Sequence, residues 1–141
     1  MACFNENVKF NSTMAKYWMG YYLSEGLPDG KKDPVKANSF FKEAADDGIA
    51  DAQLHYAFSL LHTLNKPIPG IKFDRKVFVS YLTMAANGGN IAAQYNLGDM
   101  YFNGKILGIK DIESGTKFLK LAALNNDRRS IKILKDNGID F

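Results

Sequence analysis

The sequence predicts an all-α fold in which three pairs of antiparallel helices stack into a solenoid that a seventh helix closes. Two observations carry this prediction. A pattern typical of one helix recurs at offsets of 37 and 41 residues, beginning at Ala15, Ala52 and Ala93. Each copy is joined to a second helical pattern that ends on a pair of alanines. Hairpins of this size cannot bury their apolar faces alone, so they are expected to stack on one another.

The first helix of each unit is predicted near residues 13–25, 50–63 and 91–103. The repeated segment within each begins with alanine and has a larger apolar residue at its fifth position and a small residue at its sixth. The first, fifth, sixth and ninth positions repeat as the core face. Gly20 and Gly98 lie inside these helices at equivalent positions. Since a glycine within a helix costs about 1 kcal/mol, its recurrence predicts close helix packing.

The second helix of each unit is predicted near residues 34–47, 75–87 and 112–125. Asp33, Asp74 and Asp111 precede these helices and suit N-caps, and Pro34 suits a first helical position. The helices carry the paired alanines on their apolar faces. Residues able to adopt a positive φ follow the pairs, namely Gly48, Gly88 and Asn125-Asn126.

The predicted organisation is a single domain over residues 1–141. It begins with an N-terminal cap segment at 1–12. Three repeats follow at about 13–49, 50–90 and 91–127. A capping helix follows at about 128–137, and its helical pattern covers residues 128–136. The four extra residues of the second repeat fall between Thr63 and Asp74, where Pro67, Pro69 and Gly70 indicate a loop.

These units resemble the Sel1-like repeat, a relative of the tetratricopeptide repeat. The resemblance covers at least residues 15–130. The third unit carries the first part of the family pattern in Ala93, Leu97, Gly98, Tyr101 and Gly104. The first unit carries the second part in Asp33, Lys36-Ala37, Phe40, Ala44-Ala45, Gly48 and Ala52-Gln53. The second unit departs from the pattern, with Ala57 and Thr63 at glycine positions and Phe78 at an alanine position.

The resemblance implies protein–protein interaction, commonly through a concave face lined by the first helix of each unit. Such modules serve in signalling adaptors, in host–bacterium contacts and as immunity proteins against injected toxins. With the repeat pattern, the resemblance predicts a right-handed superhelix of three Sel1-like repeats plus a C-terminal capping helix.

Composition and motifs favour neither catalysis nor a membrane. The only cysteine is Cys3, which suits a reducing compartment. The chain shows neither a signal-peptide pattern nor an apolar run long enough to span a membrane, so we expect a cytoplasmic protein. His55 and His62 are seven residues apart, about 10 Å along a helix, which is not a metal-ligand spacing. We expect no enzymatic activity, cofactor or metal, and a solvated turn at Asp46-Asp47.

A binding surface is predicted from the fourth, seventh and eleventh positions of the first helices, which share one helix face. Aromatic residues at solvent-facing positions are typical anchors of interfaces. The predicted partner-binding residues are Trp18, Tyr21, Glu25, His55, Phe58, His62, Asn96, Asp99 and Asn103.

Each group of this surface has an alternative interpretation. Trp18 and Tyr21 could pack beneath the N-terminal segment, and a shift of the second unit's first helix could bury Phe58. The histidines and the polar residues of the third unit could form ordinary solvated faces. The loop at residues 64–73 is the alternative contact.

The sequence thus predicts a non-enzymatic module that binds another protein. It could act as an inhibitor, such as a cytoplasmic immunity protein that neutralises a secreted bacterial toxin. The alternative is an adaptor or scaffold in signalling or host–bacterium contact. We expect no nucleic-acid, membrane or small-molecule partner. A nucleic-acid binder would use the spread basic residues Lys105, Lys110, Lys117, Lys120, Arg128 and Arg129.

Overall fold

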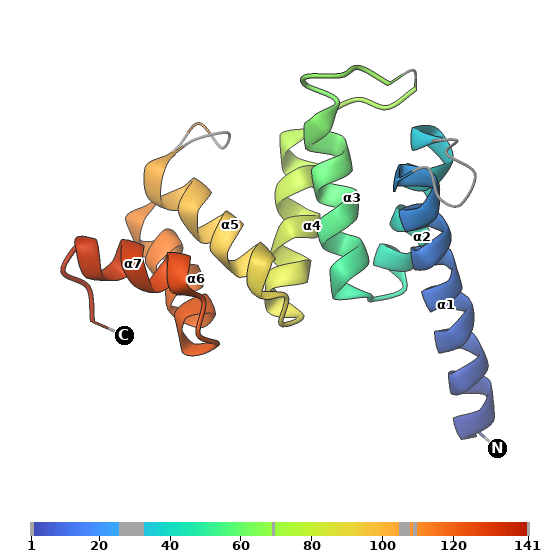
Figure 1. Ribbon diagram of the computed structural model, residues 1–141, viewed down its shortest axis with the longest axis horizontal. Helices are drawn as coiled ribbons and strands as arrows, with labels where there is room; N and C mark the ends of the chain where they lie inside the picture. Colours follow the sequence, from blue (N-terminus) through green and yellow to red (C-terminus); the bar gives the residue numbers. More distant parts are fainter. Residues whose placement is uncertain (1, 26–32, 69, 105–107, 109, 141) are drawn as a thin grey trace. The chain divides into compact units, whose positions relative to one another are not determined.

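The computed structural model describes residues 2–25, 33–68, 70–104, 108 and 110–140 (Figure 1). Within these ranges the chain is helical, apart from its loops and one isolated bridge between Ile68 and Ile71. The predicted all-α repeat fold is therefore confirmed. None of the described helices is both long and apolar enough to cross a membrane. The helices are α1 (Ala2–Glu25), α2 (Pro34–Asp46), α3 (Ala50–His62), α4 (Arg75–Asn87), α5 (Ile91–Asn103), α6 (Ile112–Leu124) and α7 (Arg128–Asp136).

Six helices begin and end within one residue of their predicted bounds, and α1 is the exception. The sequence predicts its start near residue 13, after a separate segment, but the helix begins at Ala2. The stretch from Ala2 to Thr13 contains neither proline nor glycine. Nothing local therefore stops the helix from continuing towards the N-terminus.

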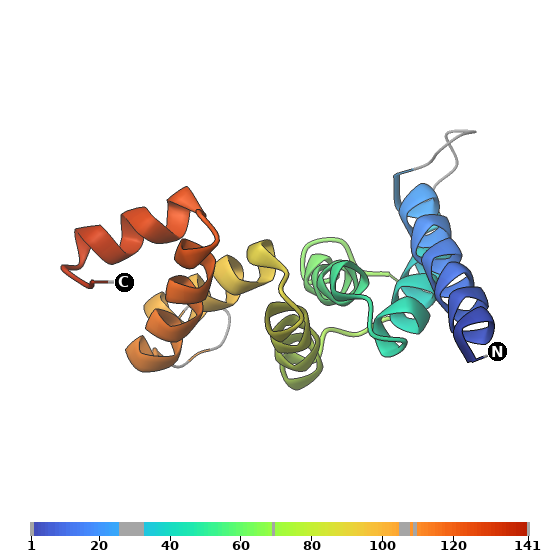
Figure 2. The same cartoon turned by 90° about the horizontal axis from the view of Figure 1, so that it is seen from below.

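The helices form two compact units, Met1–Tyr81 and Leu82–Phe141. In the first unit α1 packs on α2 and α2 on α3, and in the second α5 packs on α6 and α6 on α7 (Figure 2). Helix α4 contributes its first part to one unit and its last part to the other. The division into one domain with repeats at 13–49, 50–90 and 91–127 stays a prediction.

The three predicted N-caps of the second helices are confirmed. A side-chain oxygen of Asp33, Asp74 or Asp111 accepts hydrogen bonds from backbone N–H groups two or three residues later, at 2.9–3.3 Å. Pro34 is the first residue of α2, where it has no hydrogen bond to lose. These caps fix where the second helix of each pair begins.

The residue that adopts a positive φ after each alanine pair was predicted correctly in two repeats and wrongly in one. Gly48 has the expected positive φ of 99°, but after the second alanine pair the residue with a positive φ is Gly89, at 96°, and not Gly88. Asn126 has the third, at 67°. Each of these residues lies three positions after the second alanine of its pair, and its N–H donates to the carbonyl of that alanine. The turn geometry therefore selects Gly89, although both glycines are available.

The joints between consecutive repeats use a buried glutamine. In the first unit Gln53 Nε2 donates to the carbonyl of Ala45 at 3.1 Å. In the second unit Gln94 Nε2 donates to the carbonyl of Ala86 at 3.0 Å. Each bond satisfies a carbonyl at the end of one helix from the start of the next. The Ala-Gln pair of the sequence pattern thus has a structural role.

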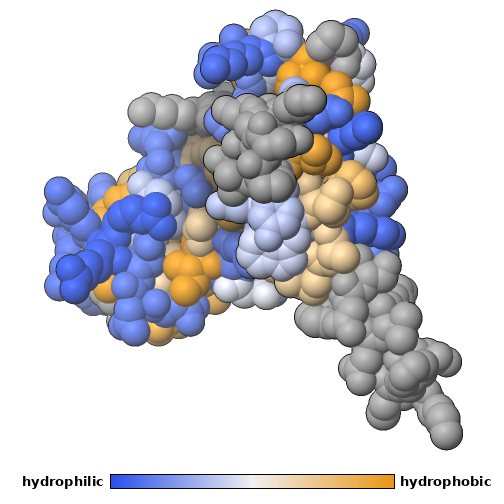
Figure 3. Space-filling model, turned by 45° about the vertical axis from the view of Figure 1, so that its right-hand side comes forward, coloured by the Kyte–Doolittle hydropathy of each residue, from blue (hydrophilic) through white to orange (hydrophobic). Residues whose placement is uncertain are grey.

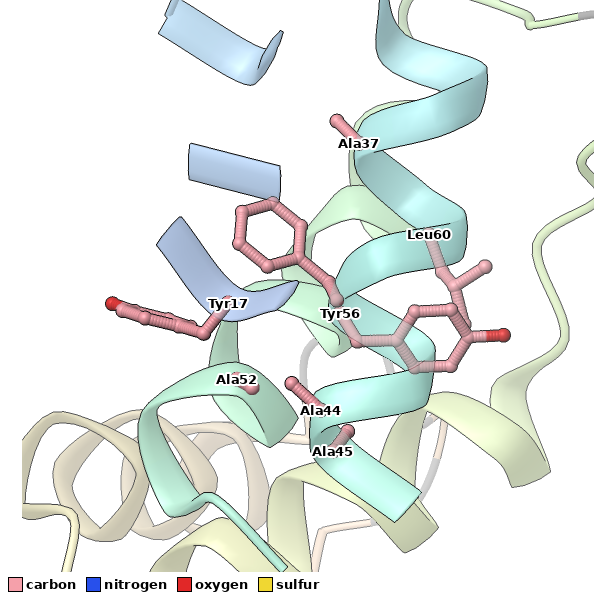
Figure 4. Close-up of a cluster of buried hydrophobic side chains, with 8 residues drawn as sticks. Tyr17, Ala37, Ala44, Ala45, Ala52, Tyr56 and Leu60 are labelled. Carbon is pink, nitrogen blue, oxygen red and sulfur yellow. The ribbon is translucent and has the colours of Figure 1, made fainter. Parts of the chain in front are cut away.

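Small residues let the paired helices approach closely, as Gly20 and Gly98 predict. A Cβ added to Gly98 would lie 2.8 Å from Leu119 Cγ, and one added to Gly20 would lie 3.0 Å from the ring of Phe41. Gly115 of α6 makes a third close approach that the sequence analysis did not single out. The core of the first unit contains Tyr17, Ala37, Phe41, Ala44, Ala45, Ala52, Tyr56 and Leu60 (Figure 4).

The N-cap of α7 supplies a pH-dependent contribution to stability. Asp127 accepts hydrogen bonds from the backbone N–H and the hydroxyl of Ser130 at 3.0 and 2.7 Å, and it pairs with Arg129. Burial opposes ionisation of this carboxyl, but the contacts from Ser130 and Arg129 outweigh it and lower the pKa of Asp127. A lowered pKa means that the carboxylate stabilises the fold at neutral pH, and that this stabilisation is lost in acid.

Asp127→Asn should therefore lower the free energy of unfolding at neutral pH, by less than about 1 kcal/mol for this partly exposed cluster. The difference from wild type should shrink as the pH falls from about 4, the ordinary pKa of an aspartate in an unfolded chain, through the lowered pKa of the folded carboxyl. Urea unfolding at neutral and acid pH measures both values. A difference that stays constant with pH would contradict the prediction.

Candidate functional site

A pocket of about 260 Å³ opens among α1, α2 and α3 of the first unit. Three of the predicted partner-binding residues, His55, Phe58 and His62, line it together from one face of α3. The other described lining residues are Ser24 from α1, Pro34, Ala37, Asn38 and Phe41 from α2, Ser59 from α3 and Ile68 from the following loop.

Polar groups of two helices meet in this pocket. Asn38 Nδ2 donates to Ser59 Oγ at 2.7 Å, and Ser59 Oγ donates in turn to the carbonyl of Tyr56 at 2.6 Å. The first bond links α2 to α3 and uses one of the two N–H groups of the Asn38 amide. The pocket therefore combines fixed polar groups with apolar walls from Phe41, Phe58 and Ile68, which is typical of binding sites.

His55 is held in place by aromatic rings of the two preceding helices. Its ring stacks on Phe41 at 5.2 Å between centroids and 14° between planes, and it lies 5.7 Å from the ring of Tyr17. The side chain is half-buried. His55 is thus an ordered wall of the pocket, whereas His62, at the end of α3, is exposed.

Phe58 contacts both the pocket and the core. It is half-buried, and its ring meets the edge of Phe78 at 6.0 Å and 78°. Phe78 is fully buried and also packs against Phe73, at 5.6 Å. The core ring of Phe78 therefore supports the pocket wall that Phe58 forms.

The predicted residues of α1 lie outside the pocket lining. Trp18 is 45% exposed, and its ring contacts Tyr17, Tyr21 and Tyr22 at 5.2, 5.7 and 6.3 Å. Packing beneath an N-terminal segment is not observed, because residues 2–12 continue α1 (Figure 1). Tyr21 is half-buried, and the side chain of Glu25 lies outside the described residues.

The predicted residues of α5 belong to the second unit. Asn103 Nδ2 donates to Asp99 Oδ1 at 3.1 Å, and Asn96 Nδ2 donates to the carbonyl of Ala92 at 2.7 Å. Their spacing places all three on one face of α5, with Asn103 exposed and the other two half-buried. They form a local polar surface of their own unit.

The acidic pair at Asp46-Asp47 is engaged in contacts between helices. The Tyr81 hydroxyl donates to Asp46 Oδ1 at 2.6 Å, and burial together with this bond raises the pKa of Tyr81. Asp47 accepts from the Thr13 hydroxyl at 3.0 Å. Across the described part of the chain, no three His, Cys, Asp or Glu side chains gather as a metal site would require.

The basic residues that a nucleic-acid binder would use differ in their contacts and their exposure. Arg129 stacks over Tyr95 at 4.0 Å and pairs with Asp127, and Lys117 lies 5.5 Å from the ring of Phe118. Lys120 is half-buried, Lys110 and Arg128 are exposed, and Lys105 lies outside the described residues.

Sequence reasoning did not include the α2 side of the pocket, Pro34, Ala37, Asn38 and Phe41, nor Ser24 and Ser59, among the predicted contacts. Pro34, Asn38 and Phe41 follow one another at helical spacing, so one face of α2 could have been recognised from the sequence. Ile68 belongs to the 64–73 loop that was named as the alternative contact. In the structure this loop and the face of α3 border the same pocket.

Comparison with known proteins identifies relatives with the same fold. A model of the Sel1 repeat matches residues 13–49 and 91–127. A Sel1 repeat protein from Oxalobacter formigenes is 30% identical, with a TM-score of 0.70 over 93% of this chain and 51% of that one. A protective antigen of uropathogenic Escherichia coli strains, c5321, displays an SLR fold. It is 26% identical, with a TM-score of 0.70 over 97% of this chain and 29% of that one.

These two structures are longer than the chain, which spans about half of the first and under a third of the second. No curated protein matches the chain.

Proposed function

Because the chain belongs to the Sel1 repeat family, we propose that it binds a partner protein and that the pocket among α1, α2 and α3 receives an anchoring side chain of that partner. Proteins of this family generally mediate protein–protein interaction. The observation that carries the proposal is the meeting of His55, Phe58 and His62 in one pocket that also contains the Asn38–Ser59 hydrogen bond.

The chemistry of the pocket supports an apolar or aromatic anchor with a polar tip. Phe41, Phe58 and Ile68 offer apolar contact, and Asn38 has one further N–H and an amide oxygen on the pocket wall. A partner side chain that enters would displace water from the apolar walls and exchange hydrogen bonds with the amide. Buried anchors of this kind supply most of the affinity of an interface.

The proposed surface extends beyond the pocket within each unit. Tyr21 and the exposed Trp18 remain proposed contacts of the first unit, with Glu25 at the end of α1. In the second unit the polar residues Asn96, Asp99 and Asn103 remain proposed contacts. Because most of an interface contributes shape rather than energy, we expect smaller losses from these positions than from Phe58.

We propose binding without catalysis and without a cofactor. The described lining of the pocket contains two histidines and two serines, but the Ser59 hydroxyl donates to the carbonyl of Tyr56, and no carboxylate or thiol side chain joins the histidines there. General acid–base and nucleophilic catalysis both require such convergent groups. The cytoplasmic location remains part of the proposal and rests on the single cysteine.

For the role of the complex, we propose inhibition of the partner, as an immunity protein inhibits its toxin. A single small repeat domain can cover one site tightly. The alternative is an adaptor in signalling or host–bacterium contact, and the description of the similar E. coli protein as a protective antigen supports it. Stoichiometry separates the two roles, since an inhibitor forms a one-to-one complex and an adaptor joins two different proteins.

Phe58→Ala should weaken binding of the partner at least about tenfold, because it removes the wall that an anchor would contact. The experiment is co-purification of the tagged full chain from its native cells, followed by titration with the purified partner. Val35→Ala is the matched control, since Val35 is exposed outside the pocket. Circular dichroism first establishes that both variants are folded.

A partner that is lost with Phe58→Ala and retained with Val35→Ala would support the pocket. Equal recovery with the wild type and both variants would contradict it. The mass of the purified complex then decides between one partner and two.

A further inference from the structure

Helix α1 presents a row of apolar side chains to solvent. Trp18, Met19 and Tyr22 are 45%, 47% and 43% exposed, and Ala15 beside them is exposed as well. They lie opposite Thr13, Tyr17 and Gly20, which are buried. Figure 3 brings the α1 side of the first unit forward and shows pale and orange surface there between hydrophilic areas. Large apolar side chains gathered on one exposed face indicate an interaction surface.

The equivalent face of α3 is covered by a helix. The repeat offset of 37 residues relates Ala15 to Ala52, and in α3 the residues at these four positions are Ala52, His55, Tyr56 and Ser59. Ala52 and Tyr56 are buried, His55 stacks on Phe41 of α2, and Ser59 accepts a hydrogen bond from Asn38 of α2. On α3 this face packs against a helix, and on α1 no described helix covers it.

Two positions of α1 that the repeat pattern predicts to be buried are exposed. Ala15 and Met19 occupy the first and fifth positions of the repeat, which the pattern predicts to be core, but both are exposed. At the equivalent positions of α3, Ala52 and Tyr56 are buried, and α2, which contacts this face of α3, belongs to the preceding repeat. The exposed face of α1 therefore uses the same repeat positions that pack against α2 in α3.

The row on α1 has the spacing of a coiled-coil seam. Ala15, Trp18 and Tyr22 follow at intervals of three and four residues, and in the sequence the same alternation continues through Asn11, Val8 and Phe4. These positions span nearly three heptads and include no charged residue. A row with this spacing remains on one side of a helix and fits another helix of similar length.

Length identifies the partner of this row. Helix α1 has 24 residues, whereas α2 to α6 have 13 each. At 1.5 Å per residue, α1 is about 36 Å long and the others are about 20 Å long. A second helix of a repeat would thus cover only about half of the row. Among the described helices, only another α1 matches its length.

We propose that α1 pairs with the α1 helix of a second copy of this chain, which makes the protein a homodimer. Without charge on the row, two identical rows meet without repulsion, and each buries the aromatic face that the isolated chain exposes. The pairing goes beyond the proposed function and leaves its pocket open, because α1 contributes only Ser24 to the described pocket lining. It assigns Trp18 to the dimer seam in place of the partner contact proposed above. A dimer would carry two pockets and bind a multivalent partner more tightly than a single copy.

The test is the mass of the full chain in solution, measured by light scattering and sedimentation over a wide range of concentration. We expect twice 15.7 kDa for the wild type and a dimer at least about tenfold weaker for Trp18→Lys, because each copy would place a charge in the seam. Val35→Lys is the control, since Val35 is 48% exposed but lies on α2 away from the row. It should remain dimeric.

Two further variants keep the test decisive. Ala15→Lys replaces a small exposed residue of the row and should also weaken the dimer, so the result does not depend on the folding of Trp18→Lys alone. Phe58→Ala should remain dimeric, which separates this proposal from the pocket. A wild type that is monomeric throughout would overturn the dimer, as would equal dimerisation of Trp18→Lys, Ala15→Lys and Val35→Lys.

Discussion

Phe78→Ala should lower the free energy of unfolding by about 3–5 kcal/mol, the range expected when a fully buried phenylalanine ring is removed from a core. Phe78 has no exposed surface, and its ring contacts Phe58 and Phe73. The family pattern has a small alanine at this position, so the variant restores the family residue and yet destabilises this chain. The effect follows because the neighbouring side chains here are arranged around the larger ring.

Urea unfolding followed by circular dichroism measures this loss. Phe40→Ala is the control, because Phe40 is the same residue type in a half-buried position on α2. Its loss should be clearly smaller. If Phe78→Ala were as stable as Phe40→Ala, the ring would not be enclosed as described. The variant should also weaken partner binding, since Phe58 would lose the ring that supports it.

Gly115→Ala should lower the free energy of unfolding by about 2–3 kcal/mol, although alanine is the better helix former by about 1 kcal/mol. The added Cβ would lie 2.8 Å from the carbonyl oxygen of Gly98 and from the backbone nitrogen of Phe102. Both are backbone atoms of α5. They cannot rotate away as a side chain can, so α5 and α6 would have to separate.

Gly20→Ala provides the comparison within the same fold. There the nearest atoms are on the ring of Phe41, at 3.0 and 3.1 Å, and a ring can shift by a few tenths of an ångström. Thermal unfolding of the two variants should therefore show the larger decrease for Gly115→Ala. A stabilised Gly115→Ala variant would contradict the close approach of α5 and α6.

The candidate site was only partly predictable, and the reason is geometric. Helical spacing within α3 correctly grouped His55, Phe58 and His62 on one face, because that relation depends on a single helix. It could not indicate that Asn38 of α2 and Ile68 of the loop would complete the pocket. The same spacing grouped Trp18 with Tyr21, but it could not indicate that Trp18 would lie outside the pocket.

The sequence by itself determined the elements: six of the seven helix bounds, the N-caps at Asp33, Asp74 and Asp111, and the recurrence of close packing at Gly20 and Gly98. These features depend on a few neighbouring residues, whose chemistry is visible in order along the chain. Only the tertiary structure decided what each helix face contacts. His55 and Trp18 occupy equivalent repeat positions, yet His55 lines a pocket against α2 while Trp18 remains exposed. The difference arises because burial depends on which helix lies next in space: α2 contacts this face of α3, whereas no described helix covers it on α1.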